Sequence, residues 1–339
     1  MLSRFTSSSL GVAAVLLSML PASAGAKTVA PNTGKPGSIC AAQQVAIDPP
    51  ADSGVLDTTS LGPKAAARYT MGAPTSRAES GRPVQRVMMF LHGGGWYTVG
   101  QGALNATQPS ADMWRSVGWE AVNVDYLPCA RSIRSALKMY DLVRAHFGPA
   151  VPICIDGDSA GGHLALMIAE RRSDVACVIT NAAPTDLTKI AKQGAHAVAA
   201  GLAATVLKAG AKLAENLAKV TFGKANLNAI SPIRAASKIT ARVLLAQSSD
   251  DVKVPAAQAA SMARAILKAH PGAYVDTDIL SPGEVEFGHG TASPGSVADY
   301  YRRVDELVAP FGRAPGHDSP PTLIDSVAKL VGWLLPGKA

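Results

Sequence analysis

Short apolar runs alternate along this chain with longer segments in which apolar residues recur at helical spacing. The first clear run, residues 87–91 (V-M-M-F-L), is continuous and suits a strand that is buried on both faces. Residues 133–147 instead carry apolar side chains at the three- and four-residue spacing of one helical face. Strands that alternate with helices of this length predict an α/β fold, with a mostly parallel central sheet and helices on both faces. The same pattern predicts further strands at residues 121–126, 153–155, 175–180, 243–246 and 274–280, and further helices at residues 111–117, 163–172, 255–269 and 296–308.

Two parts of the chain depart from this alternation. Residues 189–222 contain no proline, are rich in alanine and place apolar residues at helical spacing, which predicts one or two amphipathic helices inserted between core strands. We interpret the insertion, at about residues 186–229, as a helical cap over a functional site; a peripheral helical layer is the alternative. From residue 54 to residue 75 the pattern is weak and indicates strands without placing them.

The first 26 residues have the composition of a secretory signal peptide. Arg4 precedes an uncharged apolar run over residues 10–20, and small residues at A-x-A spacing follow, so that cleavage after Ala24 or Ala26 fits the pattern. The apolar run is too short to span a bilayer comfortably. We therefore expect a secreted or periplasmic protein without a stable membrane anchor, in which residues 27–339 form a single domain.

The composition allows a large core and gives no sign of nucleic-acid binding. Hydrophobic residues make up 47% of the chain, and the net charge of +7 comes from scattered lysines and arginines that are not interleaved with aromatic residues. We therefore expect a small-molecule substrate and no nucleic-acid partner.

Four cysteines would survive processing, and export would permit disulfides. Cys154 and Cys177 fall in predicted buried strands, where we expect them to act as small hydrophobes. Cys40 and Cys129 lie in loop-like sequence and are the better candidates for a bridge. None of the four has the spacing of a zinc site, and we expect no metal and no organic cofactor.

A sharp turn joins the strand at residues 153–155 to the helix that follows it. Gly157, Ser159 and Gly161 form a G-x-S-x-G motif in this strand–turn–helix setting. A serine on so tight a turn has a strained backbone, and only residues without bulk fit two positions before and after it. The helix that begins there also points N–H groups toward developing negative charge. We therefore predict that Ser159 is a nucleophile.

A serine hydroxyl needs a base within hydrogen-bond reach and a carboxylate that orients the base. With an elbow serine in an alternating α/β fold, the chain order should be serine, acid, histidine. Asp250 and Asp251 follow the strand at residues 243–246, and His289 follows the strand at residues 274–280. Both loops lie beyond the carboxyl ends of strands, where α/β sheets place their ligand sites. We prefer Asp251 as the acid, because it stands immediately before the next helix, and keep Asp250 as the alternative.

Three glycines after the first buried strand supply the remaining requirement of acyl transfer. In the motif H-G-G-G-W at residues 92–96, the backbone can approach a reacting centre and expose its N–H groups without side-chain interference. A preorganised donor at an oxyanion is worth about 2.7–4 kcal/mol. We predict an oxyanion hole made by the N–H groups of Gly93, Gly94 and Ala160, with Gly95 as a further candidate donor.

The motifs H-G-G-G-W at 92–96 and G-D-S-A-G-G-H-L-A at 157–165 resemble the hallmarks of one group of α/β-hydrolases. This is the esterase/lipase group that includes the bacterial hormone-sensitive-lipase-like carboxylesterases. S-P-I at 231–233, D-x-x-V-P at 251–255 and G-H-G at 288–290 also match its general pattern, so that the resemblance covers roughly residues 85 to 310.

The resemblance implies the α/β-hydrolase fold, although the group's N-terminal cap helices are not evident and the insertion at 186–229 is unusual in composition. It also implies a catalytic triad of Ser159, Asp251 and His289. The chain departs from the group at residues 126–130, where Y-L-P-C-A stands in place of the Y-R-L-A-P-E of many relatives. That departure leaves the acyl pocket unassigned.

Together these features predict an exported serine carboxylesterase that hydrolyses carboxylic esters through an acyl-enzyme intermediate. Trp96 and Tyr97 are candidate pocket walls. Because H-G-G-G-W also resembles arylformamidase-like enzymes, a serine hydrolase that cleaves amide or peptide bonds is the alternative. A non-catalytic binding protein on the same scaffold would be expected to lack a triad member, and all three are present.

Overall fold

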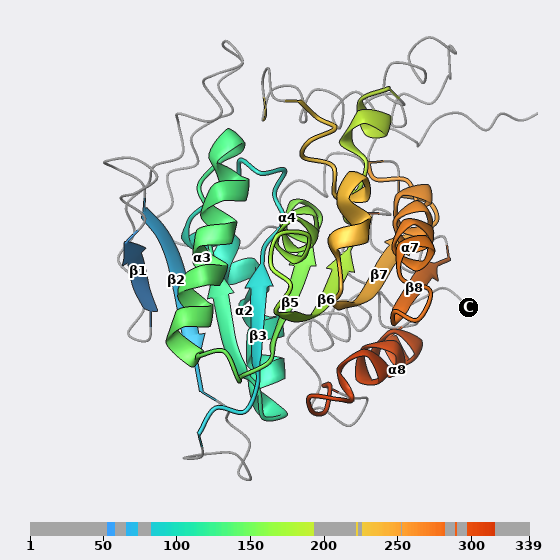
Figure 1. Ribbon diagram of the computed structural model, residues 1–339. Helices are drawn as coiled ribbons and strands as arrows, with labels where there is room; N and C mark the ends of the chain where they lie inside the picture. The colour runs from blue at the N-terminus through green and yellow to red at the C-terminus, as the bar shows by residue number, and fades with distance from the viewer. Residues whose placement is uncertain are drawn as a thin grey trace, which may run out of the picture.

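A computed structural model describes residues 53–57, 66–73, 83–192, 222, 226–251, 253–281, 289 and 297–315. The described residues form one eight-stranded sheet with helices packed on both of its faces (Figure 1). The predicted signal peptide and most of the predicted cap insertion lie outside these residues and remain predictions. In chain order the elements are β1 (Ser53–Asp57), β2 (Ala66–Gly72), β3 (Val87–Leu91), α2 (Gln101–Ser116), β4 (Glu120–Val124), η2 (Cys129–Arg131), α3 (Ser132–Phe147), β5 (Ile153–Asp158), α4 (Ala160–Ala169), β6 (Val175–Asn181), η3 (Pro232–Lys238), β7 (Arg242–Ser248), α7 (Ala257–Ala269), β8 (Val275–Leu280) and α8 (Val297–Val308).

The sheet has the strand order β1-β2-β4-β3-β5-β6-β7-β8. Strands β3 to β8 pair in parallel, whereas β2 pairs antiparallel with both β1 and β4. Parallel neighbours require a crossover between them, and helices α2, α3, α4 and α7 provide these connections. The predicted mostly parallel sheet with helices on both faces is confirmed.

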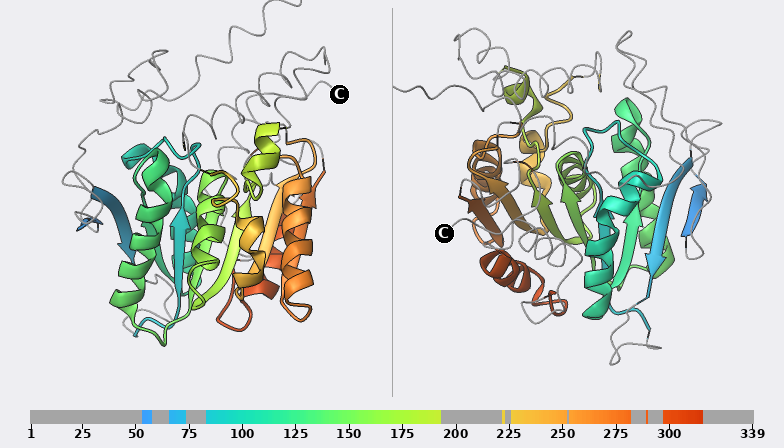
Figure 2. Two further views of the ribbon diagram at one scale, coloured as in Figure 1. Left: turned by 45° about the horizontal axis from the view of Figure 1, so that its top comes forward. Right: turned by 180° about the vertical axis from the view of Figure 1, so that it is seen from behind.

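Alternate residues of each central strand face two separate layers of the core. Val87, Met89 and Leu91 of β3 pack on the side covered by α3, α4 and α7. Met88 and Phe90 pack on the opposite side, with apolar residues of α2 and α8. The view from behind in Figure 2 shows α2 (teal) and α8 (dark orange) lying across that second face. All five residues of β3 are therefore buried, as its continuous apolar run predicts.

The structure extends two of the predictions made from pattern alone. Helix α2 begins ten positions earlier than predicted, because Ala103 and Leu104 are buried and hold its first turns in place, even with Pro109 inside the helix. The weak pattern near the N-terminus resolves into β1 and β2, an antiparallel pair at one edge of the sheet. In the first turns of α2, packing therefore outweighs local propensity. Among the described helices, none is long and apolar enough to cross a membrane.

A disulfide joins two neighbouring strands of the sheet. Cys154 of β5 and Cys177 of β6 are partners in the parallel register, with Cα atoms 4.5 Å apart, and form a bond. The expectation that they act only as small hydrophobes is wrong, because adjacent in-register residues on one face lie within bridging distance. Cys129 is also disulfide-bonded; Cys40, its predicted partner, lies outside the described residues.

The insertion leaves and rejoins the core at one place. The backbone N–H of Leu187 donates to Ser231 Oγ at 3.0 Å, and Arg234 pairs with Asp186 at 3.1 Å. Residues 226–231, which we name the return segment, bring the chain back from the insertion to η3. The two ends of the insertion are thereby held next to each other, at the edge of the sheet where β6 has its carboxyl end (Figure 1).

Candidate active site

Ser159 stands on a strained turn between β5 and α4. Its backbone has φ 49° and ψ −112°, in the region that favours glycine. Any side chain at Gly157 would place a Cβ 2.5 Å from the backbone oxygen of Gly161, and one at Gly161 would overlap the carbonyl of Leu91. The G-x-S-x-G spacing is therefore required by backbone contacts on both sides of the serine.

The structure brings Ser159, His289 and Asp251 together, although they follow three different strands. His289 Nε2 lies 3.0 Å from Ser159 Oγ, and His289 Nδ1 lies 2.6 Å from Asp251 Oδ2. Because an ionised carboxylate can only accept, His289 donates from Nδ1 and presents Nε2 as the acceptor for the serine hydroxyl. The arrangement suits transfer of a proton from Ser159 to His289.

Asp251 is held by several donors besides His289. Gln247 donates from Nε2 to Asp251 Oδ2 at 2.7 Å, and the backbone N–H groups of Lys253 and Val254 donate to Oδ1 at 2.8 and 2.9 Å. Asp250, the alternative acid, accepts a hydrogen bond from Ser248 Oγ. Of the two candidate carboxylates, Asp251 is therefore the one that contacts the imidazole.

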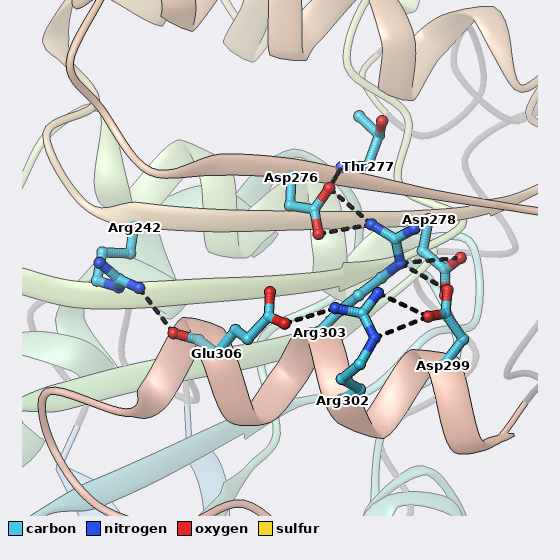
Figure 3. A network of polar contacts seen from close by, with 8 residues as sticks. All are labelled: Arg242, Asp276, Thr277, Asp278, Asp299, Arg302, Arg303 and Glu306. Carbon is cyan, nitrogen blue, oxygen red and sulfur yellow. Dashed lines mark hydrogen bonds and ion pairs between the residues drawn. The ribbon is translucent and has the colours of Figure 1, made fainter.

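The segment that carries His289 runs from the end of β8 to the start of α8, and an ion network joins these two elements (Figure 3). Arg303 of α8 donates to both carboxylate oxygens of Asp276 on β8, at 2.8 and 2.7 Å, and to Asp299 at 2.9 Å. These hydrogen bonds raise the pKa of the Arg303 guanidinium. The network holds α8 against β8, the two elements between which the His289 segment runs.

The residues that follow β3, which we name the glycine turn (residues 93–96), lie against the serine. A Cβ added at Gly93 would be 3.5 Å from Ser159 Cβ. Gly94, Gly95 and Trp96 all have positive φ, at 109°, 62° and 64°. Ala160 is the first residue of α4, so its N–H is one of the helix donors without an intrahelical partner. The predicted oxyanion donors thus flank Ser159 from two sides.

The side chains of His92, Asp125 and Tyr126 brace the glycine turn, a role that their sequence positions alone do not assign. His92 Nε2 donates to Asp125 Oδ1 at 2.9 Å, and the N–H of Gly100 donates to Asp125 Oδ2 at 2.7 Å. The Tyr126 hydroxyl donates to the carbonyl of His92 at 3.0 Å. Asp125 therefore ties His92, just before the glycine turn, to Gly100, four residues after it. A signal for this role was present, since Asp125 and Tyr126 are polar residues at the carboxyl end of a buried strand.

Burial sets the protonation of several groups around the turn. Burial raises the pKa of Tyr126 well above its usual value, which keeps its hydroxyl a donor. Burial also raises the pKa of Asp158, beside the serine, and that of Asp156 on the same strand.

Trp96, a predicted pocket wall, is 5% exposed and packs inside the protein. Its ring meets those of His163 and Phe222 edge to face, at 5.3 and 5.2 Å between centroids. Tyr97, the other predicted wall, is half-buried. Phe222 belongs to the predicted cap insertion, so at least one residue of the insertion packs against the glycine turn.

Comparison with known proteins agrees with this architecture. Residues 141–309 match the prolyl oligopeptidase family, and no curated protein is significantly similar to the chain.

Several solved structures are similar to the chain. A thermophilic esterase from the planctomycete Thermogutta terrifontis, with propionate bound, is 18% identical with a TM-score of 0.54; the match covers 77% of this chain and 95% of that one. Thermogutta terrifontis esterase 2 phosphonylated by sarin has a TM-score of 0.56 at 19% identity, covering 77% and 96%. An α/β-hydrolase from the metagenome of Lake Arreo, Spain, has a TM-score of 0.52 at 16% identity, covering 69% and 75%. The likeness at these identities is one of fold: the chain has the α/β-hydrolase fold, and its part from residue 141 to residue 309 resembles the prolyl oligopeptidase family.

Proposed function

We propose that the protein is an exported serine hydrolase that cleaves carboxylic esters through an acyl-enzyme intermediate. The observation that carries the proposal is the continuous hydrogen-bonded series from Ser159 through His289 to Asp251, with the serine on a strained elbow. A serine, a base and an orienting carboxylate in this geometry are the parts needed to activate a hydroxyl nucleophile.

In the proposed reaction, Ser159 Oγ attacks the ester carbonyl while His289 Nε2 takes the serine proton. Asp251 stabilises the imidazolium and keeps Nδ1 protonated. The carbonyl oxygen, now negatively charged, accepts hydrogen bonds from the N–H groups of Gly93, Gly94 and Ala160. His289 then gives its proton to the departing alcohol, and the acyl group remains on Ser159. A water molecule that His289 deprotonates next releases the acid and restores the serine.

The first test is hydrolysis of p-nitrophenyl esters from acetate upward, with Ser159→Ala alongside the natural sequence. We expect turnover to fall by about 10³-fold or more in the variant, because the nucleophile is lost. An active Ser159→Ala protein, or a folded natural protein without turnover on any ester, would contradict the proposal.

The chain offers a matched pair for the acid. Asp251→Asn should lower kcat by up to about 10⁴-fold, because an amide at this position favours the wrong histidine tautomer. Asp250→Asn changes the neighbouring residue in the same way and should leave kcat within about threefold, since Asp250 contacts Ser248 instead. Equal losses in the two variants would remove the assignment of Asp251.

A second candidate function, cleavage of amide or peptide bonds, is favoured by the match of residues 141–309 to a family of oligopeptidases. The two functions share the triad and differ in the leaving group that His289 must protonate. Turnover of a matched pair, one acyl group presented as a p-nitrophenyl ester and as a p-nitroanilide, separates them. A proline-containing peptide p-nitroanilide extends the test to the chemistry that the family name describes. A higher kcat/KM for the anilides would establish the second function.

Export is supported by the sequence of the first 26 residues and by the disulfide between Cys154 and Cys177. Disulfides persist in oxidising compartments and are rare in the cytosol. Cell fractionation with immunodetection checks the proposal. Export predicts that the protein appears outside the cytosol in a form shortened at its N-terminus.

A further inference from the structure

Trp96 ends the glycine turn in a conformation that is unfavourable for its residue type. Its φ of 64° is rare for a bulky side chain, and the conformation persists only where surrounding contacts impose it. One such contact is made by its backbone, because the N–H of Cys129 donates to the Trp96 carbonyl at 2.7 Å. The indole makes the other.

The Trp96 indole joins a directed series of two hydrogen bonds. Its Nε1–H donates to His163 Nδ1 at 3.0 Å, and His163 Nε2 lies 2.7 Å from the carbonyl of Ile230. An indole N–H can only donate, so Nδ1 of His163 is the acceptor and the ring proton resides on Nε2, which donates to Ile230. The two contacts therefore require a neutral His163 in a single tautomer.

The three residues of this series come from three different parts of the site. Trp96 belongs to the glycine turn, His163 to the first turns of α4, and Ile230 to the return segment of the insertion. Both rings are buried, with exposed fractions of 5% and 0%, and Phe222 packs against them at 4% exposure. A shift of any one part would break a buried hydrogen bond, which is costly.

We propose that Trp96 and His163 are positioning residues that hold the N–H groups of the glycine turn against Ser159 and link their position to the return segment of the insertion. The inference rests on the proposed function, because the N–H groups that Trp96 and His163 would position are the oxyanion donors of that reaction. Neither side chain takes part in proton transfer. Their effect on the reaction comes through the placement of Gly93 and Gly94.

The test uses three variants of the full chain and one matched control. Trp96→Phe keeps an aromatic ring against Phe222 and removes the donor. His163→Phe removes both hydrogen bonds, whereas His163→Asn keeps an acceptor where Nδ1 lies. The control is Trp119→Phe, a buried tryptophan in the opposite core layer whose indole donates to the carbonyl of Arg313 at 2.7 Å.

We expect Trp96→Phe and His163→Phe to lower kcat for p-nitrophenyl acetate about tenfold with KM within twofold, because misplaced oxyanion donors weaken the transition state more than the ground state. The double variant should lose no more than His163→Phe alone, since that substitution already removes the hydrogen bond between Trp96 and His163. His163→Asn should retain most of the activity. Trp119→Phe should lower stability without changing kcat of the folded protein.

Amide hydrogen exchange of residues 93–97 gives a readout that does not depend on turnover. Exchange there should be faster in Trp96→Phe than in Trp119→Phe. If Trp96→Phe resembles the control in both kcat and exchange, the positioning role is refuted. If the natural protein hydrolyses no ester, the proposed function fails, and exchange alone then decides whether Trp96 and His163 hold the turn.

Discussion

Acidification should destabilise the protein through His163, a residue that lies outside the proton path of the proposed reaction. The pKa of this imidazole is lowered from 6.5 to about 4, chiefly by burial and also by the nearby charge of Arg171, whereas the hydrogen bond to Ile230 opposes the shift. Protonation would also turn Nδ1 into a donor facing the Trp96 indole, which is itself a donor.

The sign of the effect follows from proton linkage. Between pH 6.5 and pH 4 the unfolded chain binds a proton at His163 that the folded protein does not, so the free energy of unfolding rises with pH. The contribution of the neutral His163 to the free energy of unfolding is complete above pH 6.5 and is lost as the pH falls through 4. The difference between the two pKa values corresponds to about 3 kcal/mol.

The measurement compares the natural protein with His163→Asn by urea denaturation at several pH values from 7 to 4. Other buried groups contribute with the opposite sign, since burial raises the pKa of Glu120 and Glu170, but they are common to both proteins and cancel. From pH 7 to pH 4, we expect the natural protein to lose about 3 kcal/mol of unfolding free energy relative to the variant. Parallel curves of unfolding free energy against pH would refute the reasoning, and His163→Gln replaces the variant if it fails to fold.

Three further predictions concern the framework of the site. Gly161→Ala should lower the free energy of unfolding by about 3 kcal/mol or more and abolish turnover, because the added Cβ would overlap the backbone of β3. The control is Gly102→Ala in α2, where the added Cβ meets open space, and this variant should be neutral or stabilising in thermal denaturation. Replacing Cys154 and Cys177 together by alanine should lower the unfolding free energy by about 3 kcal/mol in urea, since the bond closes a long loop; an unchanged midpoint would contradict this. Arg303→Met should lower the free energy of unfolding by about 1 kcal/mol at low ionic strength and by less in 1 M NaCl, because salt screens the partly exposed ion pairs of Arg303. A loss of stability that does not depend on salt would count against an electrostatic role.

The sequence was most informative where chemistry and backbone geometry coincide. Gly157 and Gly161 flank Ser159 because backbone atoms approach both positions, and such a requirement is visible as a spacing. The alternation of short apolar runs with amphipathic segments similarly predicts the strands of the central sheet and the helices that cover it. A strand that is buried on both faces has no position left for a polar residue, so it stands out as a continuous apolar run. His289 was located by chain order alone, and the structure places it within hydrogen-bond distance of Ser159.

Pattern was least informative where a contact joins residues that are remote in sequence. Position before a helix favoured Asp251 over the adjacent Asp250, but only the fold of the loop after β7 places Asp251 against His289. The bond between Cys154 and Cys177 depends on strand register, which residues 23 positions apart do not reveal. The support of the glycine turn by Asp125, and that of Trp96 by His163, likewise arises only when the carboxyl ends of separate strands meet at one edge.

By itself, then, the sequence determined the fold class, the elbow and the candidate serine, acid and base, because periodicity and local backbone constraints are encoded in neighbouring residues. The tertiary structure alone decided which carboxylate contacts the candidate base, which cysteines pair, and which buried side chains brace the glycine turn. Those choices depend on distances between separate elements, and such distances are set by the packing of the sheet and its two helical layers.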